Sequence, residues 1–292
     1  MSLHWVWIVV VVVLGSEWLG RWWVRRAWRR KQQALLARAP AARSELVSEG
    51  EGHEPAQPLQ DPDDLPAPVA RYLRMAQPEG REVRVLRMKQ EGRLRKDPSS
   101  TRWMDFTAEQ VVVPGAPGFV WNARVALGHG VHLRVLDSYV DGLGGGQVSL
   151  LSQLPLGREQ RGPELTEGAL HRYLAEGPWY PSALRPGAAL RWNAIDDSRA
   201  LATLEDRQTT VSLEFWFGDS GLVEGIYTPG RQARRGQGFE KLAWEGHFQD
   251  YEERQGLLIP MAAEVGWYLD GQWKRVWEGR ITAVEFRFAE DG

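Results

Sequence analysis

Strict alternation of apolar and polar residues is the feature that most constrains the fold of this chain. In TVSLEFWF, residues 210–217, the apolar side chains of one face are Val211, Leu213, Phe215 and Phe217. The same period of two recurs in VHLRV (131–135) and TAVEFRF (282–288). Successive side chains of a strand point to opposite faces of its sheet, so this period indicates half-buried antiparallel strands.

Turn-forming pairs separate these segments, and only two segments have helical spacing. The helical segments are LPAPVARYLRMA, which begins at Leu65, and PELTEGALHRYLAE (163–176), which ends at Gly177-Pro178. Strands and helices do not alternate regularly, so a parallel sheet is not expected. The pattern predicts a mainly β (β-rich α+β) fold. We expect a single large curved antiparallel sheet (half-barrel) with two or three short helices, one packed on its concave face.

The N-terminal region, residues 1–31, is predicted to be a membrane anchor with a basic flank. LHWVWIVVVVVLGSEWLGRWWV (3–24) is long enough to cross about 30 Å of hydrocarbon and carries tryptophan near both ends. Basic residues lie near the end of this segment and after it, and none precedes it: Arg21, Arg25, Arg26, Arg29, Arg30 and Lys31. The positive-inside rule therefore predicts a single-pass inner-membrane protein with a cytoplasmic body. A cleaved signal, a periplasmic body and an interfacial helix over 16–30 are the alternatives.

Composition divides the rest of the chain into two parts and excludes some partners. Residues 32–64 are rich in Ala, Glu, Pro, Gln and Asp, which predicts a disordered linker before a β-rich domain at 65–292. A net charge of -2 gives no attraction for nucleic acid. The chain has no cysteine, which excludes disulfides and thiol catalysis.

Three motifs resemble functional signatures without matching them. GDSG (218–221) lacks the context of a protease nucleophile and predicts a tight turn between strands. GLGGGQ (142–147) breaks the spacing of a phosphate loop and predicts a glycine bend or bulge, with close approach of a ligand as the alternative. No His-Glu-x-x-His motif is present, so we expect no metal and no cofactor.

The stretch HRYLAEGPWYPSALRPG (171–187) is the candidate active site, although a structural corner is the favoured interpretation. Gly177-Pro178 ends a helix, and Trp179 and Tyr180 are expected to insert into the sheet. The alternative is a hydrolase whose candidate catalytic residues are Glu176, Asp137 and His171. That alternative requires the groups to converge on one pocket.

Aromatic side chains are the candidates for a ligand-binding surface. Nine of the 15 tryptophans lie in the predicted β-rich domain. Trp216 alternates against the apolar face of its strand, so either both faces of that strand are covered or one lines a cavity. The candidate ligand-binding residues are Trp179, Tyr180, Trp216, Tyr139 and Trp121.

Several blocks of the sequence resemble an uncharacterised bacterial family known only as a domain of unknown function. The resemblance runs from Leu65 to the C-terminus, and its clearest mark is the block formed by Glu176 and residues 179–184. The family has no assigned reaction, so the resemblance implies no catalytic residue. The order of strands and helices is also similar to lipoprotein carriers of the LolA/LppX kind. That similarity implies a sheet wrapped around helices with lipid between them, and a periplasmic location.

These features predict a membrane-anchored, non-enzymatic protein that binds a lipid or other apolar ligand in its curved sheet. The expected partners are membrane lipid and an apolar small molecule, and nucleic acid is not expected. The alternatives are the hydrolase and a membrane-associated module that binds a protein partner through a flat apolar patch.

Overall fold

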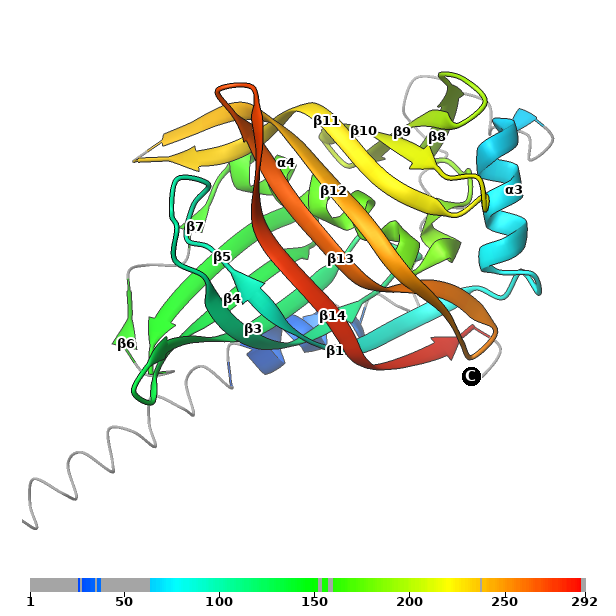
Figure 1. Ribbon diagram of the computed structural model, residues 1–292. Coiled ribbons are helices and arrows are strands. Elements are labelled where there is room, and N and C mark those ends of the chain that lie inside the picture. Colours follow the sequence, from blue (N-terminus) through cyan, green and yellow to red (C-terminus); the bar gives the residue numbers. More distant parts are fainter. Residues whose placement is uncertain are drawn as a thin grey trace, which may run out of the picture.

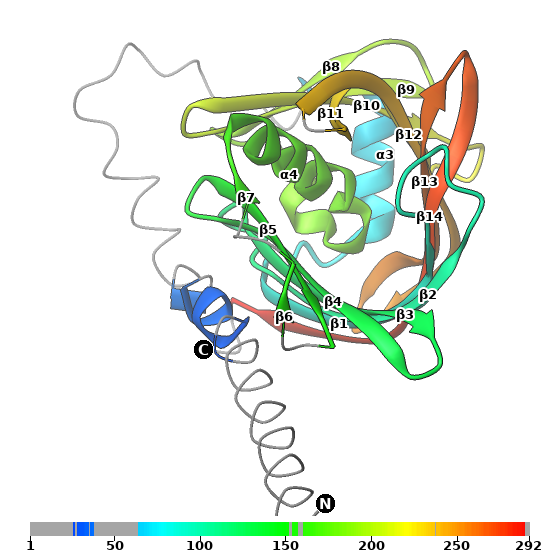
Figure 2. The ribbon, with the colours of Figure 1, turned by 90° about the vertical axis from the view of Figure 1, so that its left-hand side faces the viewer.

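A computed structural model shows an antiparallel sheet curled around two helices (Figures 1 and 2). It describes residues 64–289, except 152–153, 157–159 and 237, and N-terminal residues 26, 28–34 and 36–37. The strands are β1 (Val83–Leu94), β2 (Met104–Val112), β3 (Phe119–Gly128), β4 (Val131–Val140), β5 (Leu143–Leu150), β6 (Leu154–Pro155), β7 (Gln160–Arg161), β8 (Leu190–Ala194), β9 (Arg199–Asp206), β10 (Thr209–Phe217), β11 (Val223–Arg235), β12 (Gly238–Arg254), β13 (Leu257–Leu269) and β14 (Gln272–Phe288).

The first and last strands pair at the middle of the sheet. The order is β6-β5-β4-β3-β2-β1-β14-β13-β12-β11-β10-β9-β8, and β7 pairs with β5. The chain therefore builds one half of the sheet outward from β1 and the other half inward from β8. The predicted mainly β fold, with one curved antiparallel sheet and short helices, is confirmed.

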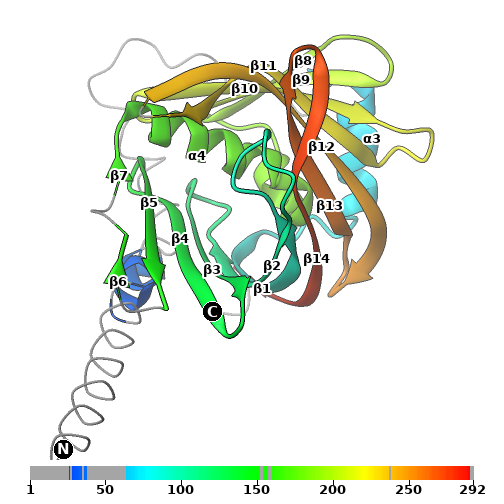
Figure 3. The ribbon, with the colours of Figure 1, turned by 60° about the vertical axis from the view of Figure 1, so that its left-hand side comes forward.

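Helices α3 (Ala67–Ala76) and α4 (Pro163–Ala175) lie inside the curve of the sheet (Figure 2). Helix α4 begins at Pro163 and α3 has Pro68 as its second residue, where the fixed φ of proline suits the first turn. Both helices were predicted from their spacing. Helix α4 packs against β5 on one side and against β10 and β11 on the other (Figure 3). It therefore bridges the two halves of the sheet and fills part of the concave face.

A short N-terminal helix covers part of the convex face. Its Trp28 and Leu36 pack on an apolar cluster on β1–β4 and the residue after β2, and Lys31 Nζ donates to Ser138 Oγ at 3.0 Å. The cluster consists of Val85, Val111, Val113, Val120 and Leu136. Strands β1–β4 are therefore covered on both faces where this cluster lies.

The predicted anchor segment at 3–24 lies outside the described residues. Within the part of the chain that is described, no helix is both long and apolar enough to span a bilayer. Helical residues continue to Ala37, beyond the predicted end of the anchor region at 31. The domain boundaries at 31 and 64 stay a prediction.

The glycine motifs lie in a turn and in a strand. Gly221, with a φ of 82°, closes the predicted GDSG turn between β10 and β11. The prediction of a glycine bend over 142–147 is correct only at Gly142, whose φ is 71°. Gly144 lies within β5, and a Cβ there would stand 2.4 Å from the carbonyl oxygen of Leu165 in α4. The backbone that approaches this glycine thus belongs to the chain's own helix.

Gly144→Ala is expected to destabilise the fold by about 1–3 kcal/mol, since α4 must move to admit the methyl group. The Gly144 N–H donates to Thr166 Oγ1 at 3.1 Å, which holds the strand against the helix. Gly146→Ala is the matched control, because its Cβ would find its nearest neighbour at 4.0 Å. Urea unfolding measures both variants, and an equal loss in both would contradict this account.

Candidate functional site

The stretch 171–187 forms a buried structural corner. Helix α4 ends at Ala175, and two turns of 3₁₀ helix follow, η2 (Gly177–Trp179) and η3 (Pro181–Leu184). The Trp179 indole donates to the Pro260 carbonyl at 3.0 Å, and the Tyr180 hydroxyl donates to the Tyr173 carbonyl at 2.6 Å. The aromatic residues of the corner are thus bonded to backbone groups, as the structural interpretation requires.

An ion-pair network lies beside this corner and joins two of the candidate catalytic residues. Arg172 donates to Glu176 through Nε and to Asp137 through Nη1, each at 2.7 Å. Gln110 on β2 donates to the second oxygen of Glu176 and accepts from Arg172 at 3.4 Å. The guanidinium also lies 4.9 Å from the ring centroid of Phe119. The structure therefore brings Asp137 and Glu176 together through a shared cation.

The charge balance of the network favours a structural role. Burial alone would lower the pKa of Arg172, but the carboxylates of Glu176 and Asp137 outweigh burial and raise that pKa above its ordinary value. Each carboxylate bonds the guanidinium instead of facing an open substrate site. The described structure gives no support for the hydrolase alternative.

The third candidate catalytic residue, His171, points away from this network. Its Nδ1 lies 3.2 Å from the carbonyl oxygen of Glu167, so Nδ1 carries the hydrogen and donates. Burial, followed by the charge of Arg231, lowers the pKa of His171 to about 4, against the opposing influence of Glu167. His171 is therefore neutral near pH 7 and does not join the two carboxylates.

The five aromatic candidates lie on different faces of the sheet. Tyr139 and Tyr180 are fully buried, and the Tyr139 hydroxyl donates to Asp206 at 2.7 Å. Trp179 and Trp121 are nearly buried on the concave side, next to other aromatic rings. Trp216 instead lies on the convex face, stacked on Tyr227 with ring centroids 6.1 Å apart. A role for any of these five in ligand binding stays a prediction.

An apolar band that sequence reasoning did not identify crosses the concave face. Its members are partly exposed, and cross-strand pairs link them: Val265 with Trp277, Trp277 with Leu94, and Leu94 with Met104. The band continues through Phe106 and Val125 to Leu133. We define the apolar band as Leu94, Met104, Leu133, Val135, Val265, Trp267 and Trp277.

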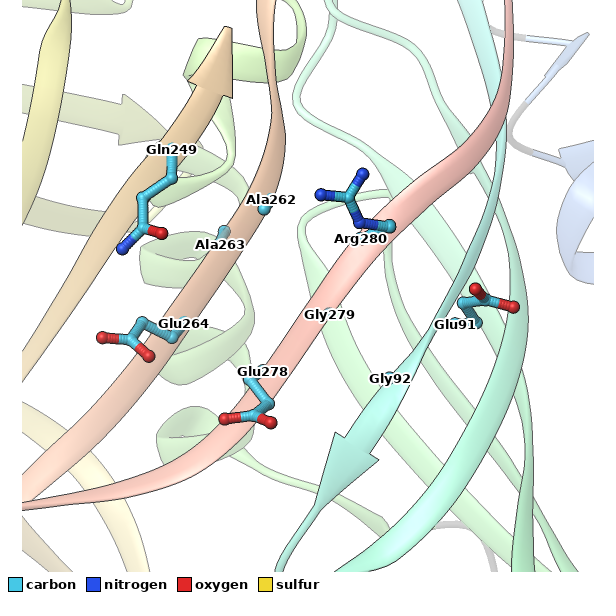
Figure 4. A pocket seen from close by; sticks show the side chains of 9 residues that line it. All are labelled: Glu91, Gly92, Gln249, Ala262, Ala263, Glu264, Glu278, Gly279 and Arg280. Carbon is cyan, nitrogen blue, oxygen red and sulfur yellow. The ribbon is translucent and has the colours of Figure 1, made fainter.

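A polar hollow of about 340 Å³ lies over strands β1, β12, β13 and β14 (Figure 4). Glu264 and Glu278 line it on neighbouring strands, and both form ion pairs with Arg275. It contains none of the residues nominated from sequence, and its charged lining does not suit an apolar ligand. Among the described residues, no group of three or more His, Asp and Glu side chains could hold a metal ion.

Comparison with known proteins gives a family and distant structural neighbours. No curated protein matches the chain. A LolA superfamily protein from Nitrosomonas europaea is similar in structure, with 12% identity, 76% of this chain and 92% of that chain covered, and a TM-score of 0.41. A putative outer membrane lipoprotein-sorting protein domain from Vibrio parahaemolyticus is 10% identical, with 70% of this chain and 85% of that chain covered and a TM-score of 0.40. A β-barrel-like DUF1849 protein from Brucella abortus is 12% identical, with 71% of this chain and 99% of that chain covered and a TM-score of 0.21.

The family match covers most of the chain and confirms the resemblance seen in the sequence. A family model described as a family of unknown function aligns with residues 63–286, which include α3, α4 and nearly all of the sheet. This chain belongs to that family, DUF6920.

Proposed function

We propose that this protein binds a lipid or other apolar molecule on the concave face of its sheet. The observation that carries the proposal is the apolar band. Its seven residues pack against the core on the inside of the curve yet keep part of their surface exposed. Covering such a surface is favourable by about 25 cal/mol for each Å² of apolar area removed from water.

The position of α4 explains why the apolar band is uncovered. Helix α4 packs on β4, β5, β10 and β11, whereas the band lies mainly on β13, β14, β1 and β2 (Figure 3). Aromatic rings form the wall beneath it, with Phe106 5.7 Å from Trp277 and Trp277 6.5 Å from Trp179 between centroids. A concave hydrocarbon surface beside a helix is suited to an elongated apolar ligand.

We place this binding domain at a membrane, as a single-pass inner-membrane protein with a cytoplasmic or, alternatively, periplasmic body. The support is the apolar segment 3–24 followed by basic residues. The N-terminal helix that comes next is docked on β1–β4 through Trp28 and Leu36, and its Arg29 and Arg30 are exposed. This docking would hold the curved sheet close to the lipid surface.

Mass spectrometry of an organic extract of the natively purified full-length chain tests the proposal. We expect a bound apolar molecule near one equivalent in the wild type. Val265→Asp should reduce it about tenfold or more, because a carboxylate in the apolar band opposes a hydrocarbon ligand. Ile195→Asp is the matched control, because Ile195 is an exposed apolar residue outside the band. An empty wild-type extract, or an equal loss in both variants, would contradict the proposal.

A further inference from the structure

Arg231 on β11 is a partly buried cation that forms no ion pair with a described carboxylate. Its Nη2 donates to the carbonyl of Gly168 in α4 at 2.9 Å, and no acidic group among the described residues forms an ion pair with it. Its guanidinium carbon lies 4.4 Å from the ring centroid of Trp244 and 5.3 Å from that of Trp267. Strands β11, β12 and β13, which carry these three residues, run side by side (Figure 1).

Two hydrogen-bond donors at this place have no acceptor. Arg231 Nε and Trp244 Nε1 are both inaccessible to solvent and unpartnered, and Trp244 as a whole is only 3% exposed. A buried donor without an acceptor is costly, and native proteins satisfy nearly all of them. The guanidinium lies over the face of the Trp244 ring, and neither Arg231 Nε nor Trp244 Nε1 has an acceptor among the described residues.

The charges around Arg231 leave it available for an anion. Burial, followed by repulsion from Arg172, lowers the pKa of Arg231 to about 10, so it stays charged at neutral pH. Asp137 and Glu176 attract it from a distance, but both bond to Arg172. Glu167 bonds to Lys241 and to Gln232 instead, and His171 is neutral.

Trp267 connects this charge to the apolar band. It belongs to the band, pairs with Trp244 across β12 and β13, and lies under the Arg231 guanidinium. We propose that Arg231 and Trp244 bind the anionic head of an amphiphile whose hydrocarbon chain lies on the apolar band. This inference rests on the proposed function and narrows its ligand to a long-chain carboxylate or phosphate monoester.

Binding of three ligands with the same hydrocarbon chain tests the inference: palmitate, hexadecyl phosphate and hexadecanol. Each ligand is titrated into the full-length protein in the same detergent-free membrane mimetic, and isothermal calorimetry measures its affinity. We expect one or both anions to bind about tenfold or more tightly than hexadecanol, because charge-assisted hydrogen bonds exceed neutral ones. The tighter of the two anions identifies a carboxylate or a phosphate head.

Two variants separate the head site from the band. Arg231→Met keeps an apolar stem of similar length, and Trp244→Phe keeps the ring but removes its donor. Arg231→Met should lose the preference for anions and Trp244→Phe should reduce it, while hexadecanol affinity stays the same in both. Arg234→Met, at an exposed arginine of the same strand, should change neither affinity.

The outcomes distinguish this inference from the function on which it rests. Equal wild-type affinity for the anions and hexadecanol would overturn the head site and leave apolar binding intact. Failure of all three ligands to bind the folded wild type would overturn both. An anion preference that survives in both Arg231→Met and Trp244→Phe would also overturn the assignment of these residues.

Discussion

Arg172→Met is expected to lower the free energy of unfolding by about 3–5 kcal/mol, the usual cost of removing one partner from a buried ion pair. The change leaves Glu176, whose side chain is 12% exposed, without its cation. The Asp137 side chain is 35% exposed, so water can replace part of its lost interaction. Most of the lost stability therefore comes from the uncompensated charge of Glu176. Urea unfolding at pH 7 measures the loss.

A second substitution shows whether uncompensated charge causes the loss. Arg172→Met combined with Glu176→Gln should be more stable than Arg172→Met alone, since the amide keeps a partner in Gln110 without a buried charge. Arg199→Met is the control at an exposed ion pair with Asp196, and it should have no measurable effect. A double variant as unstable as Arg172→Met would point to lost packing against Phe119 instead.

The sequence predicted most of the fold, because the period of its apolar residues is a local signal. The alternation in 210–217 matches β10, where Val211, Leu213, Phe215 and Phe217 are all buried. The two segments with helical spacing are α3 and α4. The pairing of β1 with β14 joins residues nearly 200 positions apart, and no local pattern carries that information.

The candidate site was predicted only in part, because register decides which side chains meet. The sequence points to Glu176 and Asp137 separately, but nothing in it singles out Arg172, which joins them from within the stretch 171–187. Gln110 and Asp137 reach Arg172 from positions 62 and 35 residues away. The apolar band was missed for the same reason, since each member is one ordinary apolar residue in its own strand.

Trp216 shows the limit of reasoning from one strand. The sequence left open whether both faces of that strand are covered or one lines a cavity. In the structure Trp216 covers Gly225 on the neighbouring strand, where a Cβ would lie 2.7 Å from the indole ring. Its Nε1 donates to Glu214 at 2.6 Å on the convex face. The large side chain thus shields a glycine of the sheet, and it does not face the apolar band.

Protonation of His171 is expected to lower the free energy of unfolding by about 3 kcal/mol between pH 7.5 and pH 4. This loss adds to the contributions of other titrating groups. The folded pKa of His171 is about 4, lowered by burial and then by Arg231, whereas its unfolded pKa is near 6.5. The unfolded chain therefore binds the proton more readily. The contribution of His171 is complete above pH 6.5 and is lost as the pH falls toward 4.

Urea unfolding of the wild type and His171→Gln at several pH values isolates this contribution. The variant has no imidazole to protonate, so its stability should fall less steeply between pH 6.5 and pH 4, and the two curves should converge at low pH. His129→Gln is the control, because His129 is exposed at the turn between β3 and β4, and that variant should follow the wild type. Parallel curves for wild type and His171→Gln would mean that His171 protonates freely in the folded protein. Burial beside Arg231 and Lys241 would then not hold this imidazole neutral.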